Sequence, residues 1–363
     1  MLKIALVVDQ PSFSGIGRYA LELSKGLRNA NISATLIRQT VQEDNSDSQN
    51  KVRLRAGVPS PKVPLLMRKN RNKLIESRVL DDFDIIHFIG SNYEMSKSYH
   101  NVICTIHEFY FSLPHRFSDL LKKSTLVDTY YNYSILKLYR RIHSFPKIVV
   151  PSQHVQKDIL NKCNVNAEVI YHWVDKTLFK KRDKEASRSK LGLDLKYKYV
   201  LNVSQQGFNK NQQTILRVAN LLPRNFKILH IGNQLKHKNI ININQVQDDL
   251  YPEYFNAADV YIHTSTNEGF GFPLLESIAS GLPVISNTLG TSKEVLGNTG
   301  IYVSRALNAR DYAREIMDLI SKEPYLDVER KILNRSYYFS EESSIKKYKY
   351  LYSDFLGGAD ELA

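Results

Sequence analysis

The stretch Asn267-Glu268-Gly269-Phe270-Gly271-Phe272-Pro273-Leu274-Leu275-Glu276 sets two glutamates eight positions apart around a glycine-rich bend. The apolar run before it, Asp259 to His263, predicts a buried strand. The residues after it, Ser277 to Ile285, predict a short helical turn that leads into another strand. We therefore expect both glutamates where a strand passes into a helix. In α/β proteins, ligands bind at this carboxyl edge of a parallel sheet.

The length of the chain predicts two domains. Its 363 residues exceed the roughly 250–300 residues at which a single hydrophobic core stops growing. Charged residues crowd the segment from Lys176 to Lys198, which marks the expected linker and the start of the second domain. The predicted domains are 1–175 and 176–340, and a C-terminal helix within 341–363 is expected to cross back to the first domain.

Short apolar strands alternate with helical segments in both halves, which favours α/β domains with doubly wound parallel sheets. In the first half, the strand Lys3 to Val8 is followed by a loop with Gly15 and Gly17, and then by a helix from Arg18 to about Ala30. A strand, a glycine turn and a helix in this order can aim backbone N–H groups at a phosphate. A tight turn also needs glycine, so this pattern alone leaves both interpretations open.

Two histidines accompany predicted strands of the first half. His107 follows the apolar run Val102 to Ile106, so it is expected at the carboxyl end of the sheet. There it can face a ligand or make a structural hydrogen bond. His87 lies within the strand Ile85 to Ile89 between apolar neighbours, which favours a core histidine.

The charge of the chain calls for an anionic partner. There are 50 Lys and Arg residues against 37 Asp and Glu residues, which gives a formal net charge of +13. Basic residues interleaved with apolar side chains and tyrosines gather in 51–80 and 120–141. Such stretches suit either peripheral contact with an anionic membrane or packed helices with a solvated basic face. No nucleic-acid-binding motif accompanies the charge, so no nucleic acid is expected as a partner.

Membrane spans, targeting signals and metal sites are not predicted. No run approaches the ~18–20 apolar residues of a membrane span, and the first strand is too short for a signal-peptide core. The two cysteines, Cys104 and Cys163, stand apart from any second metal ligand. The expected location is the cytoplasm, with contact at the inner face of the cell membrane as the accompanying hypothesis.

Eight short segments in a fixed order carry a resemblance to a known family. They are Ser14 to Tyr19, Thr105 to Glu108, Val150 to Ser152, Val174-Asp175, Lys210-Asn211, Asn267 to Glu276, Gly281 to Ile285 and Gly300 to Val303. With these segments the chain resembles the family 4 (group 1) retaining glycosyltransferases of the GT-B fold, including bacterial and archaeal mannosyltransferases. The resemblance implies two Rossmann-like domains whose parallel sheets face each other across an interdomain cleft.

The resemblance also implies an activity. A hexose of mannose or glucose type would pass from a nucleoside diphosphate sugar, GDP- or UDP-linked, to an acceptor hydroxyl with retained anomeric configuration. The acceptor would be a lipid-linked or cell-surface glycan precursor, bound by the first domain, while the second domain binds the donor. No metal ion or separate cofactor is expected.

Site residues follow from the same resemblance. Catalytic roles are expected for His107, Glu268 and Lys210. Glu276 would accept hydrogen bonds from the ribose hydroxyls, a use that suits a carboxylate. The full set expected at the donor is Gly15, Gly17, Gln205, Lys210, Gly269, Phe270, Gly271, Phe272 and Glu276.

Two positions depart from the family pattern. Gln205 stands where an arginine commonly joins Lys210 in holding the diphosphate, so one charge is missing unless another base such as Arg18 replaces it. His172 and Trp173 stand where Asn-Gly often precedes Val-Asp. These two residues either pack or shape the acceptor site, and the sequence leaves both possibilities open.

Three other functions compete with glycosyl transfer. A sugar-nucleotide epimerase of the same fold would need no acceptor, and a weakened sugar-nucleotide binding protein would fit the loss of arginine at Gln205. A dinucleotide-dependent dehydrogenase is excluded because the segment from Gly15 to Ala20 lacks the third spaced glycine of that fingerprint.

Overall fold

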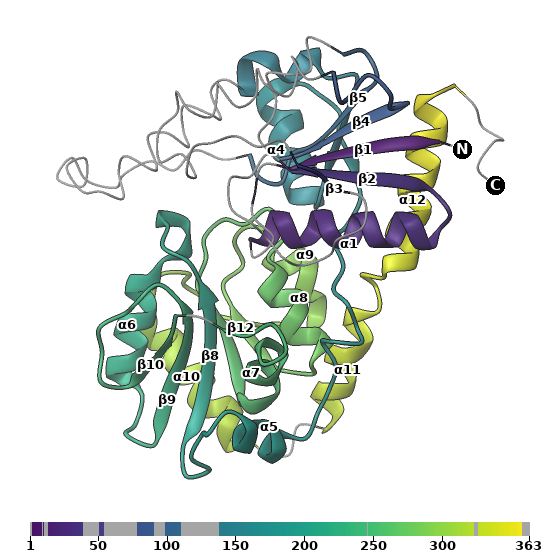
Figure 1. Cartoon of the computed structure of the whole chain (residues 1–363). Coiled ribbons are helices and arrows are strands. Elements are labelled where there is room, and N and C mark those ends of the chain that lie inside the picture. Colours follow the sequence, from purple (N-terminus) through teal and green to yellow (C-terminus); the bar gives the residue numbers. More distant parts are fainter. Residues whose placement is uncertain are drawn as a thin grey trace. The chain divides into compact units, whose positions relative to one another are not determined.

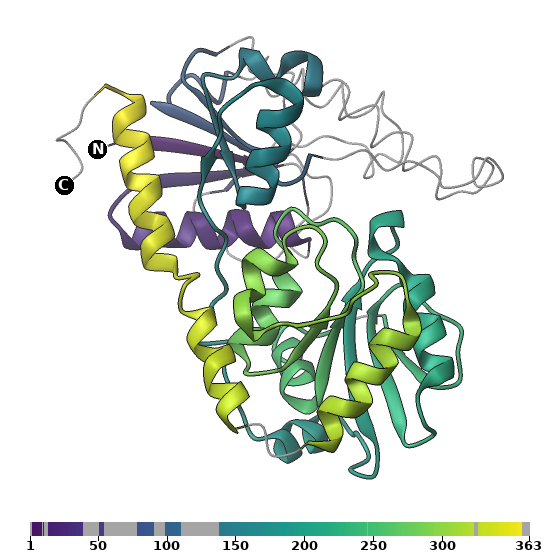
Figure 2. The same cartoon turned by 180° about the vertical axis from the view of Figure 1, so that it is seen from behind.

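The computed structural model describes residues 2–8, 10, 14–38, 51–53, 78–90, 99–109, 138–244, 246–322 and 326–357. The chain divides into two compact units (Figures 1 and 2). The N-terminal domain is Met1–His172 together with Glu341–Ala363, and the C-terminal domain is Trp173–Ser340. The sequence predicts this boundary after residue 175, and the interdomain cleft stays a prediction.

The N-terminal domain contains a seven-stranded parallel sheet in the order β3-β2-β1-β4-β5-β6-β7. The chain runs outward from β1 to β3 and then returns to start again at β4, so the strand order reverses between β1 and β4. The strands are β1 (Lys3–Val8), β2 (Ser33–Arg38), β3 (Lys51–Arg53), β4 (Ile85–Ile89), β5 (Val102–Thr105), β6 (Lys147–Val150) and β7 (Glu168–Val169).

Four helical segments of this domain are described: α1 (Gly15–Asn29), the 3-10 turn η3 (Ile142–Ser144), α4 (Gln153–Cys163) and α12 (Glu341–Phe355). Helix α1 begins at Gly15, earlier than the predicted Arg18, because the hydroxyl of Ser14 caps it by accepting from the Gly17 amide at 3.0 Å. Ser152 caps α4 in the same way by accepting from the Val155 amide at 3.2 Å.

Helix α12 is part of the N-terminal domain although it comes last in the chain. A Cβ atom built on Gly26 of α1 would lie 2.6 Å from the Ile345 side chain, so α12 packs closely on α1. The hydroxyl groups of Tyr19 and Tyr348 are hydrogen-bonded. His87 is fully buried and bonds the Tyr352 hydroxyl at 2.8 Å through Nδ1. His87 is therefore a core histidine, as its flanking residues predict, and it ties α12 to the sheet.

The C-terminal domain contains a six-stranded parallel sheet in the order β10-β9-β8-β11-β12-β13. Its strand order reverses between β8 and β11. The strands are β8 (Lys198–Ser204), β9 (Phe226–Gly232), β10 (Ile240–Ile243), β11 (Val260–His263), β12 (Val284–Ser286) and β13 (Ile301–Tyr302). The two parallel sheets confirm the predicted α/β class with two Rossmann-like domains.

The helical segments described for this domain flank its sheet. Helices α6 and α10 share one apolar core with strands of the sheet. The segments are α5 (Lys184–Lys190), η4 (Phe208–Lys210), α6 (Gln212–Leu221), α7 (Tyr251–Ala257), α8 (Phe272–Ala279), α9 (Ser292–Leu296), η5 (Gly297–Thr299), α10 (Ala309–Ser321) and α11 (Leu326–Ser336). No helix within the described part of the chain is long and apolar enough to cross a membrane.

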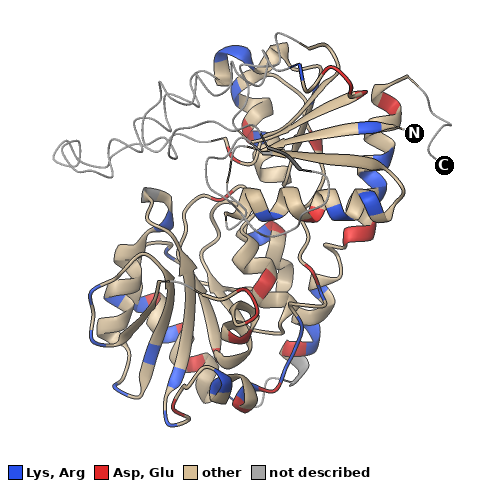
Figure 3. Ribbon diagram, in the orientation of Figure 1, with Lys and Arg blue, Asp and Glu red and all other residues tan. Residues whose placement is uncertain are grey.

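The charged segment from Lys176 to Lys198 lies in the first part of the C-terminal domain, as predicted, but it is folded into that domain and is not a linker. Bases of this segment lie on α5 and just before it, where the ribbon in Figure 3 is partly blue, and they pair with two buried acids. Asp259 pairs with Arg188 at 2.8 Å and with Lys184 at 2.9 Å. Glu253 pairs with Arg182 at 2.6 Å and with Lys190 at 2.8 Å. These acids lie some 60 to 75 positions along the chain, so local composition alone could not show that the charges were paired.

Candidate functional site

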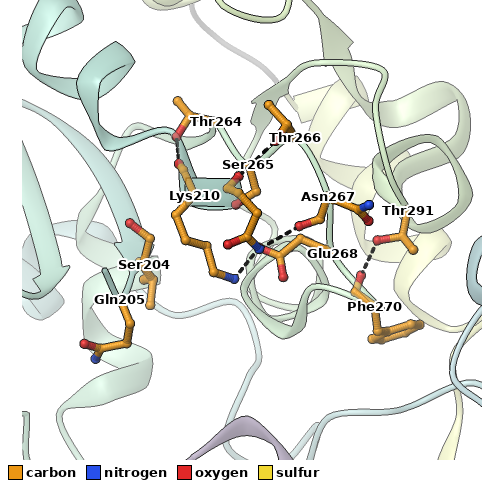
Figure 4. Close-up of polar contacts among 12 residues, drawn as sticks. Ser204, Gln205, Lys210, Thr264, Ser265, Thr266, Asn267, Glu268, Phe270 and Thr291 are labelled. Atoms are coloured by element: carbon orange, nitrogen blue, oxygen red, sulfur yellow. Dashed lines mark hydrogen bonds and ion pairs between the residues drawn. The ribbon is translucent and has the colours of Figure 1, made fainter. Parts of the chain in front are cut away.

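The loops after β8 and β11 meet at the point where the strand order of the C-terminal sheet reverses (Figure 4). The Thr266 amide donates to the Asn209 carbonyl at 2.7 Å, and the Asn209 side chain donates to the Asn267 carbonyl at 2.9 Å. The Thr264 hydroxyl donates to the Lys210 carbonyl at 2.8 Å. The two loops therefore form one braced unit at the carboxyl edge of the sheet, where doubly wound proteins bind ligands.

Lys210 and Glu268, both predicted as site residues, form an ion pair between these loops. The Lys210 Nζ lies 2.6 Å from Glu268 Oε1, and the two side chains are 26% and 16% exposed. Burial would raise the pKa of Glu268, but the Lys210 charge, the neighbouring His263 and a hydrogen bond from Ser265 bring this pKa below its usual value. Glu268 is thus an anion held in place by a cation.

Gly290 and Thr291 pack against the glycine-rich bend between the two glutamates. Gly271 has φ +86° and caps α8, and Pro273 follows near the helix start, where its missing N–H costs no hydrogen bond. Thr291 donates to the Phe270 carbonyl at 2.8 Å (Figure 4). Gly290 has φ +59°, and a Cβ atom there would lie 3.2 Å from the Glu268 amide. Only a glycine fits this close approach to the backbone of the bend. No sequence pattern predicts this role for Gly290.

Glu276 lies on α8 with only 1% of its surface exposed. The Tyr251 hydroxyl at the start of α7 donates to its Oε2 at 2.8 Å. Tyr251 therefore sets the direction of the Glu276 carboxylate. Tyr251 was not predicted as a site residue, because a tyrosine at the start of a helix carries no motif and its partner is 25 positions away.

Gln205 is exposed at the end of β8 and does not join the ion pair. Figure 4 shows its side chain directed away from Lys210 and Glu268. Its backbone carbonyl accepts from the Gln212 side chain at 3.2 Å. Gln212 also donates to Asn233 Oδ1 at 2.7 Å, which links the ends of β8 and β9. Gln205, which was predicted to bind the donor, is therefore close to the site in sequence, but its side-chain amide points away from Lys210 and Glu268.

In the N-terminal domain, His107 follows β5 and contacts His172. His107 Nδ1 lies 3.2 Å from His172 Nε2, and Tyr19 of α1 packs against both rings. His107 Nε2 is buried and has no hydrogen-bond partner among the residues that the structure describes. His172 was left open between packing and shaping the acceptor site, and it forms a specific polar contact with a predicted catalytic residue.

The two predicted glycines of the N-terminal domain lie in the first turn of α1, close to the reversal of strand order at β1. Gly15 is the first residue of the helix and is exposed. Gly17 is buried, and its amide already donates to the Ser14 hydroxyl. Gly15 is therefore better placed than Gly17 to offer an amide to a phosphate.

Most of the segments predicted to contact a membrane, 51–80 and 120–141, lie outside the described residues. Within the described part of the chain, no group of three or more His, Cys, Asp and Glu side chains could hold a metal ion. The expectations about membrane contact and metal therefore stay predictions.

We expect acid to destabilise the N-terminal domain through its buried histidines. Burial lowers the pKa of His87 and of His107 to about 3 and also lowers that of His172. Because the unfolded histidines take up protons near pH 6.5 and the folded ones do not, stability is full above that pH and falls below it. At pH 5, His87 and His107 each lower the free energy of unfolding by roughly 2 kcal/mol, and His172 acts in the same direction.

Denaturant unfolding at pH 7.5 and pH 5.0 measures this loss. The His87→Gln variant should show a smaller difference between the two pH values, whereas replacement of the exposed His143 by glutamine should leave the difference unchanged. Equal stability of the unmodified protein at both pH values would contradict the prediction.

Two family models match consecutive parts of this chain. Residues 13–178 match "Glycosyltransferase Family 4", and residues 183–336 match "Glycosyl transferases group 1". Together the two matches span most of both domains.

Individual proteins give the same result. The O-antigen chain mannosyltransferase B of Escherichia coli is 25% identical over 79% of this chain and 82% of its own length. The alpha-monoglucosyldiacylglycerol synthase of Streptococcus pneumoniae is 29% identical over 40% of this chain. In four of the curated relatives, including the latter, the match spans only 38% to 56% of the relative's length.

Solved structures share the fold across nearly the whole chain. The sucrose-phosphate synthase of Thermosynechococcus elongatus superposes with a TM-score of 0.79 over 98% of this chain and 100% of its own, at 16% identity. At this identity the likeness concerns the arrangement of the elements alone.

Proposed function

We propose that this chain, which belongs to the family 4 (group 1) glycosyltransferases, is an enzyme that transfers a hexose from a nucleoside diphosphate sugar to an acceptor hydroxyl. One observation carries the proposal. Lys210, Glu268 and the glycine-rich bend that leads to Glu276 gather where the strand order of the C-terminal sheet reverses. This is where a doubly wound domain binds a nucleotide.

Each of these residues has a chemical use toward the donor. The Glu276 carboxylate, directed by Tyr251, accepts hydrogen bonds from the ribose hydroxyls. Lys210 stabilises the negative charge that develops on the departing diphosphate. Glu268 accepts hydrogen bonds from hydroxyls of the transferred sugar. The backbone amides of the bend donate to the adjacent phosphate oxygens, as amides at a helix N-terminus do.

The N-terminal domain binds the acceptor and supplies His107 to the transferred sugar. His107 Nε2 is the group available for this contact, because it is buried without a partner among the described residues. The α1 N-terminus at Gly15 adds an amide toward the diphosphate. We propose that the anomeric configuration is retained, as in the family that the chain belongs to.

Names of the relatives guide the substrate proposal. They include mannosyltransferases of O-antigen chains, a synthase of monoglucosyldiacylglycerol and an enzyme named for GDP-mannose. We therefore propose a GDP- or UDP-linked hexose of mannose or glucose type and a lipid-linked or cell-surface glycan precursor as acceptor. The enzyme would work in the cytoplasm, at the inner face of the cell membrane.

A thermal-shift panel of UDP-, GDP- and ADP-sugars tests the donor. A ligand at 100 times its dissociation constant stabilises the folded state by about 2.7 kcal/mol. For a domain of about 150–250 residues this raises Tm by roughly 5–10 °C. We expect one donor class to give this shift, and Glu276→Ala to remove it. A panel in which no nucleotide sugar shifts Tm would contradict the proposal.

The need for an acceptor separates transfer from epimerisation. With the best donor of the panel, free nucleoside diphosphate should accumulate faster when an acceptor glycan is supplied. Conversion of the donor sugar without nucleotide release would indicate an epimerase instead. NMR of the product linkage then tests retention of configuration.

Binding to vesicles tests the membrane hypothesis. The basic stretches 51–80 and 120–141 would be attracted to anionic lipid with roughly 1 kcal/mol for each well-placed Lys or Arg. We expect sedimentation with phosphatidylglycerol vesicles at low salt and release at high salt. No binding at low salt would exclude this part of the proposal.

A further inference from the structure

The contact between His107 and His172 joins two segments that are distant in sequence. His107 follows β5, and His172 lies in the extended segment after β7. Their rings are 5.2 Å apart, and the nitrogens His107 Nδ1 and His172 Nε2 are 3.2 Å apart. Only 1% of His172 is exposed. A hydrogen bond in such a buried place strongly limits the orientation of both rings.

Tyr19 forms the floor of this pair. Its ring centroid lies 3.9 Å from that of His172 at an angle of 38°, and 5.5 Å from that of His107 at 79°. The Tyr19 hydroxyl is in turn hydrogen-bonded to Tyr348 of α12. His172 is therefore held on one side by an aromatic ring that is itself fixed within the domain.

Because both histidines are neutral, one ring donates the hydrogen bond between them and the other accepts it. Burial lowers the pKa of both, and the neighbouring His107 lowers that of His172 further, so both rings are neutral at pH 7. A neutral imidazole has one donor nitrogen and one acceptor nitrogen. Since His107 uses Nδ1 for His172, the nitrogen that remains for a ligand is Nε2.

We propose that His172 is a positioning residue that holds His107 by Nδ1 and so presents Nε2 to the transferred sugar. This inference rests on the proposed function, in which His107 contacts that sugar. The pattern that the chain resembles often has asparagine at this position, and a histidine adds a ring that can both reach His107 and stack on Tyr19.

Two substitutions separate the hydrogen bond from the packing. His172→Phe keeps a ring over Tyr19 and removes the hydrogen bond, whereas His172→Asn loses the ring and keeps a polar group. If His172 positions His107, His172→Phe lowers kcat by about 10- to 100-fold while KM for the donor changes little. His172→Asn or His172→Gln then restores part of the activity. If the role is packing alone, His172→Phe is mild and His172→Asn is the worse variant, which would overturn the proposal.

A double-substitution experiment tests whether His172 acts through His107. In a background of His107→Ala, His172→Phe should lower kcat by less than about twofold, because the group that it positions is absent. Effects that multiply in the double variant would show an independent role and would count against the inference.

The imidazole nitrogens also give a readout that needs no activity. In protein labelled with ¹⁵N-histidine, the His107 signals should change in His172→Phe, since loss of the partner frees Nδ1. The control is His143→Gln, which alters an exposed histidine of the same domain. This control should leave the His107 signals and kcat close to those of the unmodified protein.

The outcomes distinguish the two proposals. If the unmodified protein transfers no sugar from any donor, the proposed function fails, and the ¹⁵N signals still test the hold of His172 on His107. If the enzyme is active and the His107 signals are the same with and without His172, the positioning role is wrong while the proposed function stands.

Discussion

Replacing Lys210 with methionine is expected to lower kcat for the best donor by roughly 10²- to 10³-fold, the usual cost of losing one group that stabilises developing charge. This prediction rests on the proposed function. Lys210 is held by Glu268 at 2.6 Å between the loops that follow β8 and β11. The position that often carries an arginine in this family is Gln205, whose side chain is turned away (Figure 4). The loss of Lys210 therefore removes the cation placed at the bend.

Lys210→Met also leaves the Glu268 carboxylate without its partner, and a double variant separates this effect from the loss of the lysine. Without Lys210, burial raises the pKa of Glu268 without the opposing charge that now keeps it low. In Lys210→Met with Glu268→Gln, no unpaired carboxylate remains. A double variant that recovers thermal stability would assign the stability lost in Lys210→Met to the unpaired Glu268 carboxylate. Its kcat should stay low, because both residues act on the donor.

Lys227 supplies the matched control. It lies on β9 of the same domain, and its Nζ is 3.4 Å from the Asn239 side chain. Lys227→Met should leave kcat and donor affinity within twofold of the unmodified enzyme. If Lys210→Met lowers kcat less than tenfold, the leaving-group role of Lys210 is wrong.

Asp259→Ala is expected to lower the free energy of unfolding of the C-terminal domain by roughly 3–5 kcal/mol, the cost of breaking a buried charge pair. Asp259 is 2% exposed. One of its oxygens accepts from Lys184 at 2.9 Å, and the other accepts from Arg188 at 2.8 Å and from the Tyr199 amide at 2.7 Å. Removing the carboxylate leaves the buried Arg188 guanidinium without its partner ion.

Chemical denaturation followed by a probe in the C-terminal domain measures this loss. The control is Asp194→Ala, which breaks an exposed ion pair with Lys196. Exposed pairs add little to stability, so the midpoint for that variant should stay near the original. A midpoint for Asp259→Ala equal to that of Asp194→Ala would show that the buried cluster contributes little.

Much of the fold could be predicted because most of the strands are rich in apolar residues and polar residues mark the breaks between them. The predicted strands from Lys3 to Val8 and from Ile85 to Ile89 have the predicted bounds. The start of α1 was misplaced because a single capping hydroxyl, Ser14, draws two glycines into the helix. The pairing of α5 with Asp259 and Glu253 could not be predicted from the sequence, because the tertiary fold determines which charged residues meet.

The residues of the candidate site also fall into those that the sequence predicts and those that only the fold reveals. Lys210, Glu268 and Glu276 could be identified because they lie in segments with a recognisable order, and the structure brings Lys210 and Glu268 into contact. Tyr251, Gly290 and His172 act through one contact each with a distant residue. Such contacts leave no periodicity or motif in the sequence, so only the folded chain reveals them.

Because α12 belongs to the N-terminal domain, it also sets the order in which the two domains can complete their folding during synthesis. The buried Tyr19 and His87 find their partners on α12, at Tyr348 and Tyr352, and these come from the last part of the described chain. During synthesis, the segment up to residue 172 leaves the ribosome with those groups unsatisfied, which is costly in a buried place. The C-terminal domain is contiguous and can fold before α12 appears. The domain that is translated first is therefore the one that is completed last.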